Sequence, residues 1–279
     1  MKLSVDLNDL GLPEYKVEEL YPLGEMTYYD IEEPVKRSEE GGEPEDSFIY
    51  VKEFDCPLCG KKAANPIAKI AKLRPLGTEK DLRTRYKYFE PLKYDVLCCE
   101  GCGYAAIQTN FKPLAKPHKL LLDEKIRRPF QPGILKTGVL HFEDAILRYK
   151  RAITCSKVRL GKNGEIASLC LRMAWLLRSY SEWVTEESLV QEIKQEEIKY
   201  LAAAREGLVL ARQKEGSVPG MPDLTVDYLI GILSMKLGYF QDAQKLFMAV
   251  IGNGMAAASQ KDKARDRLAE VKEMLKNSL

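Results

Sequence analysis

The sequence contains no long hydrophobic run, since no segment approaches the roughly 18 consecutive apolar residues that a membrane-spanning helix requires. Its first twenty residues also lack the uninterrupted apolar core that is typical of a secretory signal peptide. We therefore expect a cytoplasmic protein. A chain of 279 residues, 45% hydrophobic and 30% charged, is typical of a globular protein with more than one structural unit.

Histidine is scarce, with two residues in the whole chain, and the common motifs of catalytic sites are missing. We find no GxxxxGKS or GxxxxGKT loop, no GxGxxG after a strand-like run, no HExxH and no GxSxG. Asp55, Glu90, Asp95 and Glu100 are scattered through a charged part of the chain, which is typical of acids on a surface. We therefore expect that the protein is not an enzyme.

The formal net charge of +2 hides an uneven distribution along the chain. Residues 1–50 carry four Lys/Arg and fourteen Asp/Glu, whereas residues 51–130 carry seventeen and nine. Residues 39–46 combine acids with glycine and proline and have few apolar side chains to bury, which is typical of a flexible linker. Tyrosines before this linker provide some apolar surface, so we predict that residues 1–46 form an acidic, partly flexible N-terminal segment.

Four of the seven cysteines stand in two Cys-x-x-Cys-Gly turns. A disulfide framework is not expected in a reducing compartment, whereas paired turns of this kind are typical of a metal site. Tetrahedral zinc takes four thiolates, and the glycine permits the tight backbone that brings two of them together. We predict that Zn²⁺ is bound by Cys56, Cys59, Cys99 and Cys102. Four thiolates leave no vacant coordination position, so this zinc would be structural.

The cysteine pattern allows several interpretations. The gap between the turns exceeds the spacing of roughly 15–20 residues that is common in such sites, so residues 60–98 must form a structure of their own. A redox dithiol and a four-sulfur iron site are alternatives to zinc. Cys98 could replace Cys99, although strand alternation favours a spare thiol on the opposite face. Cys155 and Cys170 lie in apolar helical stripes and are expected to be buried.

Strand-like runs lead into both cysteine turns. Residues 47–54 are rich in β-branched and aromatic side chains, and residues 92–98 alternate with a period of two. Between the turns, a segment centred on Gly77 is expected to form a hairpin, although a short helix also fits part of it. We predict that residues 47–130 form a small, zinc-ribbon-like β domain.

The period of the hydrophobic pattern becomes helical from about Gly138, so residues 131–279 are predicted to be all α. Small and aromatic residues recur there at the spacing of a tetratricopeptide repeat, a helix–turn–helix unit of about 34 residues: Gly231, Gly238, Phe240, Ala243, Phe247 and Val250. A partial match recurs from Phe142 to Ala152, and an irregular helical bundle is the alternative. The predicted fold class is α+β, with the small β domain followed by a TPR-like helical domain.

This organisation predicts a non-enzymatic adaptor that binds a protein or peptide partner through its helices. The alternative is nucleic-acid binding through a basic, aromatic-rich ribbon, in which lysines and arginines contact phosphates. The basic residues concerned are Lys61, Lys62, Lys69, Lys72, Arg74, Lys80, Arg83, Arg85, Lys87 and Lys93, with Tyr86, Tyr88 and Phe89 among them. The same basic face would also suit neutralisation by the acidic N-terminal segment.

Several short motifs together resemble a bacterial protein family. They are Cys56-Pro-x-Cys59, the residues Lys72, Leu73, Arg74, Asp81 and Arg83, the run Tyr94-Asp95-Val96, the turn Cys99-x-x-Cys102-Gly103-Tyr104-Ala105, and the helix CLRMAW. Over roughly residues 48–250 the chain resembles the family known as domain of unknown function 2225. Its members are generally cytoplasmic proteins with no assigned activity, so the resemblance implies a fold plan and not a function.

Overall fold

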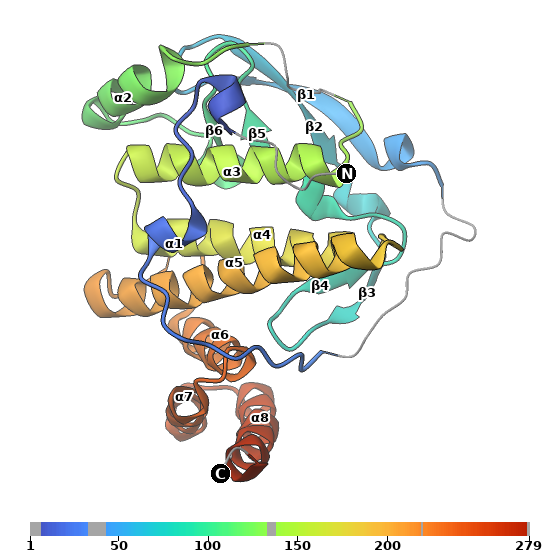
Figure 1. The fold of residues 1–279 in the computed structure, drawn as a ribbon, viewed down its shortest axis with the longest axis vertical. Helices are drawn as coiled ribbons and strands as arrows, with labels where there is room; N and C mark the ends of the chain where they lie inside the picture. The colour runs from blue at the N-terminus through green and yellow to red at the C-terminus, as the bar shows by residue number, and fades with distance from the viewer. Residues whose placement is uncertain (1–6, 33–42, 133–137, 219, 278–279) are drawn as a thin grey trace.

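The computed structural model describes residues 7–32, 43–132, 138–218 and 220–277 and has the predicted α+β class (Figure 1). Within these described residues, six strands form three antiparallel hairpins in the N-terminal part. β1 (Ile49–Asp55) pairs with β2 (Lys62–Ala68), β3 (Pro75–Thr78) with β4 (Thr84–Tyr86), and β5 (Val96–Cys98) with β6 (Ala105–Ile107).

The helices follow one another as packed neighbours. α1 (Val17–Leu20) and α2 (Lys116–Leu122) are short, and the rest are α3 (Phe142–Val158), α4 (Asn163–Ser181), α5 (Glu187–Lys214), α6 (Asp223–Lys236), α7 (Phe240–Gly252) and α8 (Ala258–Asn277). From α3 onward each helix contacts the next, so the C-terminal half is a continuous helical array (Figure 1). No helix in the described ranges is both long and apolar enough to span a bilayer.

In the helix pair α6–α7, a glycine of one helix packs against an aromatic ring of the other. A Cβ atom at Gly231 would lie 2.8 Å from the ring of Phe247, so the close approach of the two helices requires a glycine there. The similar pattern in α3 serves a different contact, because α3 packs against β5 and β6 as well as against α4. Its alanines therefore let a helix lie close to strands.

Residues 7–32 cross the helical array as an extended segment with short helical turns (Figure 1). Leu7, Leu10, Leu12 and Tyr21 are buried, and they belong to one hydrophobic cluster that also contains the cysteine turns and α3–α6. One core thus joins all three predicted segments of the chain. Much of the predicted linker lies outside the described residues.

Three local predictions differ from the structure. The stretch before the second cysteine turn is a strand only from Val96, because Pro91–Tyr94 forms a 3₁₀-helix. The middle hairpin exists, but its turn spans residues 79–83, and Gly77 lies within β3 at a register irregularity. Helix α2 lies inside the segment that was predicted to be β. Proline at the start of the 3₁₀-helix cannot donate a strand hydrogen bond, which explains the first difference.

The turn of the β3–β4 hairpin is anchored by buried ion pairs. Asp81 is fully buried, and its carboxylate lies 2.8 Å from Arg178 Nη2 in α4 and 3.4 Å from Lys236 Nζ in α6. Arg178 also pairs with Glu79 at 2.6 Å and with Glu197 of α5 at 2.7 Å. These pairs fix the hairpin to α4 and α6, and Glu197 of α5 holds Arg178 in place. They explain why the turn forms here and not at Gly77.

The charge of Asp81 is favoured in the folded protein. Burial alone would raise its pKa, but Arg178 and Lys236 outweigh that effect and hold the pKa below its ordinary value of 3.8. A carboxyl group with a lowered pKa adds stability that is complete above its ordinary pKa and is lost as the pH falls toward the folded value. The contribution of Asp81 to the unfolding free energy is therefore expected to decline progressively as the pH falls below about 4.

The substitution Asp81→Asn tests this anchor. Because Arg178 keeps Glu79 and Glu197 as partners and Lys236 keeps Glu32, the change removes one of several buried partner charges. We expect a loss of about 1.5–3 kcal/mol of unfolding free energy at pH 7, as for a hydrogen bond to a charged group. The difference from the wild type should narrow as the pH falls below 4, when denaturant unfolding is measured at several pH values. Asp262→Asn, in an exposed pair with Arg265, is the control and should change little. A pH-independent difference would contradict the electrostatic account.

Candidate metal centre

Each Cys-x-x-Cys-Gly turn closes an antiparallel hairpin. Residues 56–61 join β1 to β2, and residues 99–104 join β5 to β6. The two turns have the same hydrogen bonds. The N–H of Cys56 donates to the carbonyl of Lys61 at 2.9 Å, and the N–H of Cys99 donates to the carbonyl of Tyr104 at 2.8 Å. The N–H of Gly60 donates back to the carbonyl of Cys56 at 2.9 Å, and the N–H of Gly103 to that of Cys99 at 3.0 Å. The two turns thus present their thiols in the same way.

The four predicted ligands lie together. The sulfur atoms of Cys56, Cys59, Cys99 and Cys102 are all within 4.8 Å of one another, and the Cys56–Cys102 and Cys59–Cys99 pairs are each 3.6 Å apart. Zinc–thiolate bonds of about 2.3 Å in a tetrahedron place the sulfurs about 3.8 Å apart. The four cysteines therefore fit a tetrahedrally bound metal ion, whose identity the ligand set alone does not fix.

The thiols of the cluster differ in acidity, because hydrogen bonding to Cys56 and Cys99 together with burial raises the pKa of Cys102, whereas that of Cys99 is lowered. Cys56, Cys99 and Cys102 are buried, and Cys59 is partly exposed. Hydrogen bonds from the thiols of Cys102 and Cys56 lower the pKa of Cys99 well below its ordinary range. Since the thiolate is the form that binds metals, the cluster is suited to hold a cation where four sulfurs meet.

Cys98 is excluded from this cluster by the direction of β5. It is buried, and its backbone N–H and carbonyl are both bonded to the side chain of Asn65 in β2, at 2.9 and 3.1 Å. Arg148 of α3 donates to Asn65 at 3.0 Å and to the carbonyl of Val96 at 3.2 Å. Asn65 and Arg148 thus join the two metal-site hairpins to the helices, a role that no sequence motif indicated.

The two helical cysteines are buried as predicted. Burial raises the pKa of Cys155 and of Cys170 to about 12 in each case, so both thiols stay protonated and unreactive at neutral pH. The sulfur of Cys155 accepts a hydrogen bond from the N–H of Ala105, next to the second cysteine turn. Its role is therefore packing and hydrogen bonding behind the metal site.

The basic residues of the ribbon do not form a continuous free patch. Six of the ten form ion pairs with acids in the described residues: Lys62, Lys72, Lys80, Arg83, Arg85 and Lys93. Two of these acids, Glu43 and Glu45, precede the first strand, as neutralisation by the acidic segment requires. Phe89 is buried in a stack between Phe48 and Tyr94 and cannot stack on a base. These contacts do not favour the nucleic-acid alternative.

Substitution of the ligands tests the metal site. Cys56→Ser or Cys99→Ser should lower the bound metal from about one ion per chain to a small fraction, and should lower the melting temperature, because a structural metal contributes folding energy. Elemental analysis of the purified variants measures the first effect and calorimetry the second. Cys98→Ser is the matched control and should retain the metal. If both ligand variants kept their metal, the four-thiolate assignment would be wrong.

The two turn glycines differ in what surrounds them. Gly60 and Gly103 have φ angles of 74° and 78°, but an added Cβ would meet nothing within 4 Å at Gly60 and would lie 2.7 Å from the Phe130 ring at Gly103. Gly60→Ala should therefore lower the unfolding free energy only through backbone strain, by about 1–2 kcal/mol. Gly103→Ala should cost roughly 1–3 kcal/mol more. Denaturant unfolding measures the loss of unfolding free energy in both variants. Combining Gly103→Ala with Phe130→Ala should reduce the additional loss at Gly103, because the ring that the new Cβ meets is removed. Equal losses in Gly60→Ala and Gly103→Ala would contradict this account.

The comparisons with known proteins agree with these motifs. No curated protein and no solved structure matches the chain. A family model described as "uncharacterized protein conserved in bacteria (DUF2225)" matches residues 49–273, which include all four clustered cysteines and the helices up to α8. The chain therefore belongs to this bacterial family.

Proposed function

We propose that the protein is a non-enzymatic cytoplasmic scaffold in which a structural Zn²⁺ ion holds the ribbon together and the helices bind an extended segment of a partner protein. The observation that carries this proposal is the course of residues 7–32, an extended segment that is held along the helical array. A helical array that binds one extended segment has the surface chemistry to bind another of the same kind.

Zinc is the metal that best suits the cluster. A closed four-thiolate site has no vacant position for substrate or water, which is the arrangement of structural and not of catalytic zinc. Reduced thiols of this kind persist in the cytoplasm. The metal would close both hairpins at once, and so would fix the surface of the ribbon against which α3 packs.

The contacts of the N-terminal segment indicate what a partner would offer. The N–H of Tyr29 donates to the carbonyl of Lys236 at 2.7 Å, and Thr154 donates to the carbonyl of Pro13 at 3.3 Å. The ring of Tyr21 lies against Gly207, because a Cβ atom added at Gly207 would be 2.7 Å from that ring. A partner segment would thus be extended, with a tyrosine placed over a glycine of α5.

The α6–α7 pair supports a repeat-like reading of this surface. Its glycine-on-phenylalanine packing is the contact that the tetratricopeptide pattern requires, and arrays of such pairs commonly serve as peptide-binding platforms. A non-enzymatic role is supported by the acids near the ribbon, because Asp55 and Asp95 are paired with Lys62 and Arg172.

The peptide-binding proposal can be tested on the folded full-length chain. A protease site inserted within residues 33–42 allows the N-terminal segment to be cut from the rest after folding. We expect a labelled peptide of residues 7–32 to exchange with the cut segment in a saturable manner, measured by fluorescence anisotropy. A peptide with Tyr21→Ala should bind at least about tenfold more weakly, because it loses a buried aromatic side chain.

A peptide with Glu25→Ala, a change at an exposed position, is the matched control and should bind as the unchanged peptide does. A partner protein that uses this face should be displaced by the peptide of residues 7–32. If the labelled peptide did not exchange at millimolar concentration, or if Tyr21→Ala had no effect on its binding, the helices would not be the receptor we propose.

A further inference from the structure

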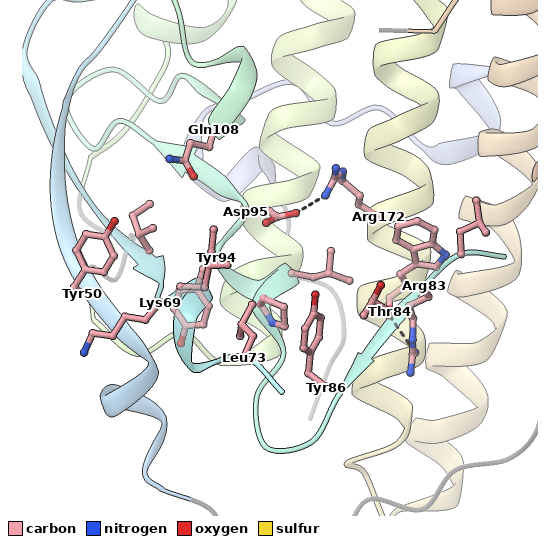
Figure 2. A pocket seen from close by; sticks show the side chains of 17 residues that line it. Tyr50, Lys69, Leu73, Arg83, Thr84, Tyr86, Tyr94, Asp95, Gln108 and Arg172 are labelled. Atoms are coloured by element: carbon pink, nitrogen blue, oxygen red, sulfur yellow. Dashed lines mark hydrogen bonds and ion pairs between the residues drawn. The ribbon is translucent and has the colours of Figure 1, made fainter. Parts of the chain in front are cut away.

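A cavity of about 580 Å³ lies between the ribbon hairpins and helix α4 (Figure 2). Its walls come from β1, β2, the β3–β4 hairpin, the 3₁₀-helix Pro91–Tyr94 and α4. Cavities of about 300–1,000 Å³ are typical of small-molecule sites, so this space is large enough for a mononucleotide. It is separate from the four-cysteine cluster, whose ligands do not line it.

Two aromatic rings enter the cavity without ring partners. Figure 2 shows Tyr50 and Tyr86 on different sides of it, on β1 and β4. Neither ring stacks on another ring in the described part of the chain, unlike Tyr94, which is stacked on Phe89. Tyrosine rings that line a cavity with their faces unused can stack on a planar ligand.

Hydrogen-bonding groups converge on the same space. Asp95 and Arg172 form an ion pair at 2.5 Å, and Figure 2 shows this pair beside Gln108 above the tyrosines. The backbone N–H of Gln108 donates to the carbonyl of Asp95 at 3.0 Å, which holds the two residues together. The amide of Gln108 has no hydrogen-bond partner within the described ranges, so it can both donate to and accept from a ligand.

The ring of Trp175 closes one side of this lining. Its indole N–H is inaccessible to solvent and has no hydrogen-bond partner among the residues that the structure describes. Because this N–H is shielded from the cavity as well as from bulk solvent, the carbon atoms of the ring, and not the donor, line the space. Burial also outweighs Arg172 and raises the pKa of Asp95, which makes its carboxylate a stronger hydrogen-bond acceptor.

From these groups we propose that the cavity binds the nucleobase of a small nucleotide. Stacking on tyrosine suits a flat aromatic ring, and adjacent carboxylate and amide groups are the side chains that bond to the edges of bases. The base stacks on Tyr86, and its edge meets Asp95 and Gln108. A phosphate-binding loop is not needed, because the base carries the recognition.

The test uses full-length, metal-loaded protein and calorimetric titration with the four nucleoside 5′-monophosphates. We expect at least one of them to bind with 1:1 stoichiometry and a Kd below about 1 mM, a modest affinity for a drug-sized cavity. Ribose 5-phosphate carries the sugar and phosphate without the base and should not bind. Binding of ribose 5-phosphate as tight as that of the nucleotides, or binding of none of the nucleotides, would overturn the proposal.

Two further measurements locate the binding. Tyr86→Leu should weaken it roughly tenfold, the usual effect of removing one stacked ring. Leu76→Ala, at an exposed position of the same hairpin outside the cavity lining, is the matched control and should leave it unchanged. In NMR spectra the indole N–H signal of Trp175 should move on titration, while that of Trp183 stays. An unmoved Trp175 signal, with unchanged affinity in Tyr86→Leu, would place the ligand elsewhere and refute the proposed site.

Discussion

The convergence of four sulfur atoms is the constraint on which the ribbon depends. Four cysteines from two hairpins lie within 4.8 Å of one another in a largely buried place, where several thiolates repel each other unless a cation joins them. Once the turns are closed, the register of both hairpins is set. Asn65 of β2 then meets the backbone of Cys98, and Arg148 of α3 bonds to both hairpins. The site thus positions helix α3 as well as the strands.

A second anchor lies at the far end of the ribbon, where the β3–β4 turn enters the ion pairs of Arg178 and Lys236. Buried ion pairs often add little net stability, because desolvation offsets their attraction. Their effect here is geometric: Asp81 has partners on α4 and α6, so the hairpin has one orientation on the helices. The cavity lies between the two anchors, and its walls are therefore held in place before any ligand enters.

The sequence predicted those features whose signals are local. The two Cys-x-x-Cys-Gly turns, the strands beside the first of them and the helical period after Gly138 each depend on neighbouring residues, and the fold class followed from them. The turn at residues 79–83 and the role of Asn65 depend on partners 33 or more residues away, in elements whose placement no spacing reveals. The cavity was missed for the same reason, since Tyr50, Asp95 and Arg172 meet only in three dimensions.

The two proposed sites share one set of ion pairs. Glu32, the last residue of the described range 7–32, pairs with Lys236 at 2.9 Å, and Lys236 also faces Asp81 of the hairpin turn. The same hairpin supplies Thr84 and Tyr86 to the cavity. Displacement of the N-terminal segment would remove one of the two carboxylates that neutralise a fully buried lysine. The charge of Lys236 would then be neutralised by Asp81 alone. The free energy of the hairpin's position is therefore coupled to whether a segment occupies the surface of the helices. In the proposed scaffold, the peptide surface and the cavity would therefore be connected through the buried charge of Lys236.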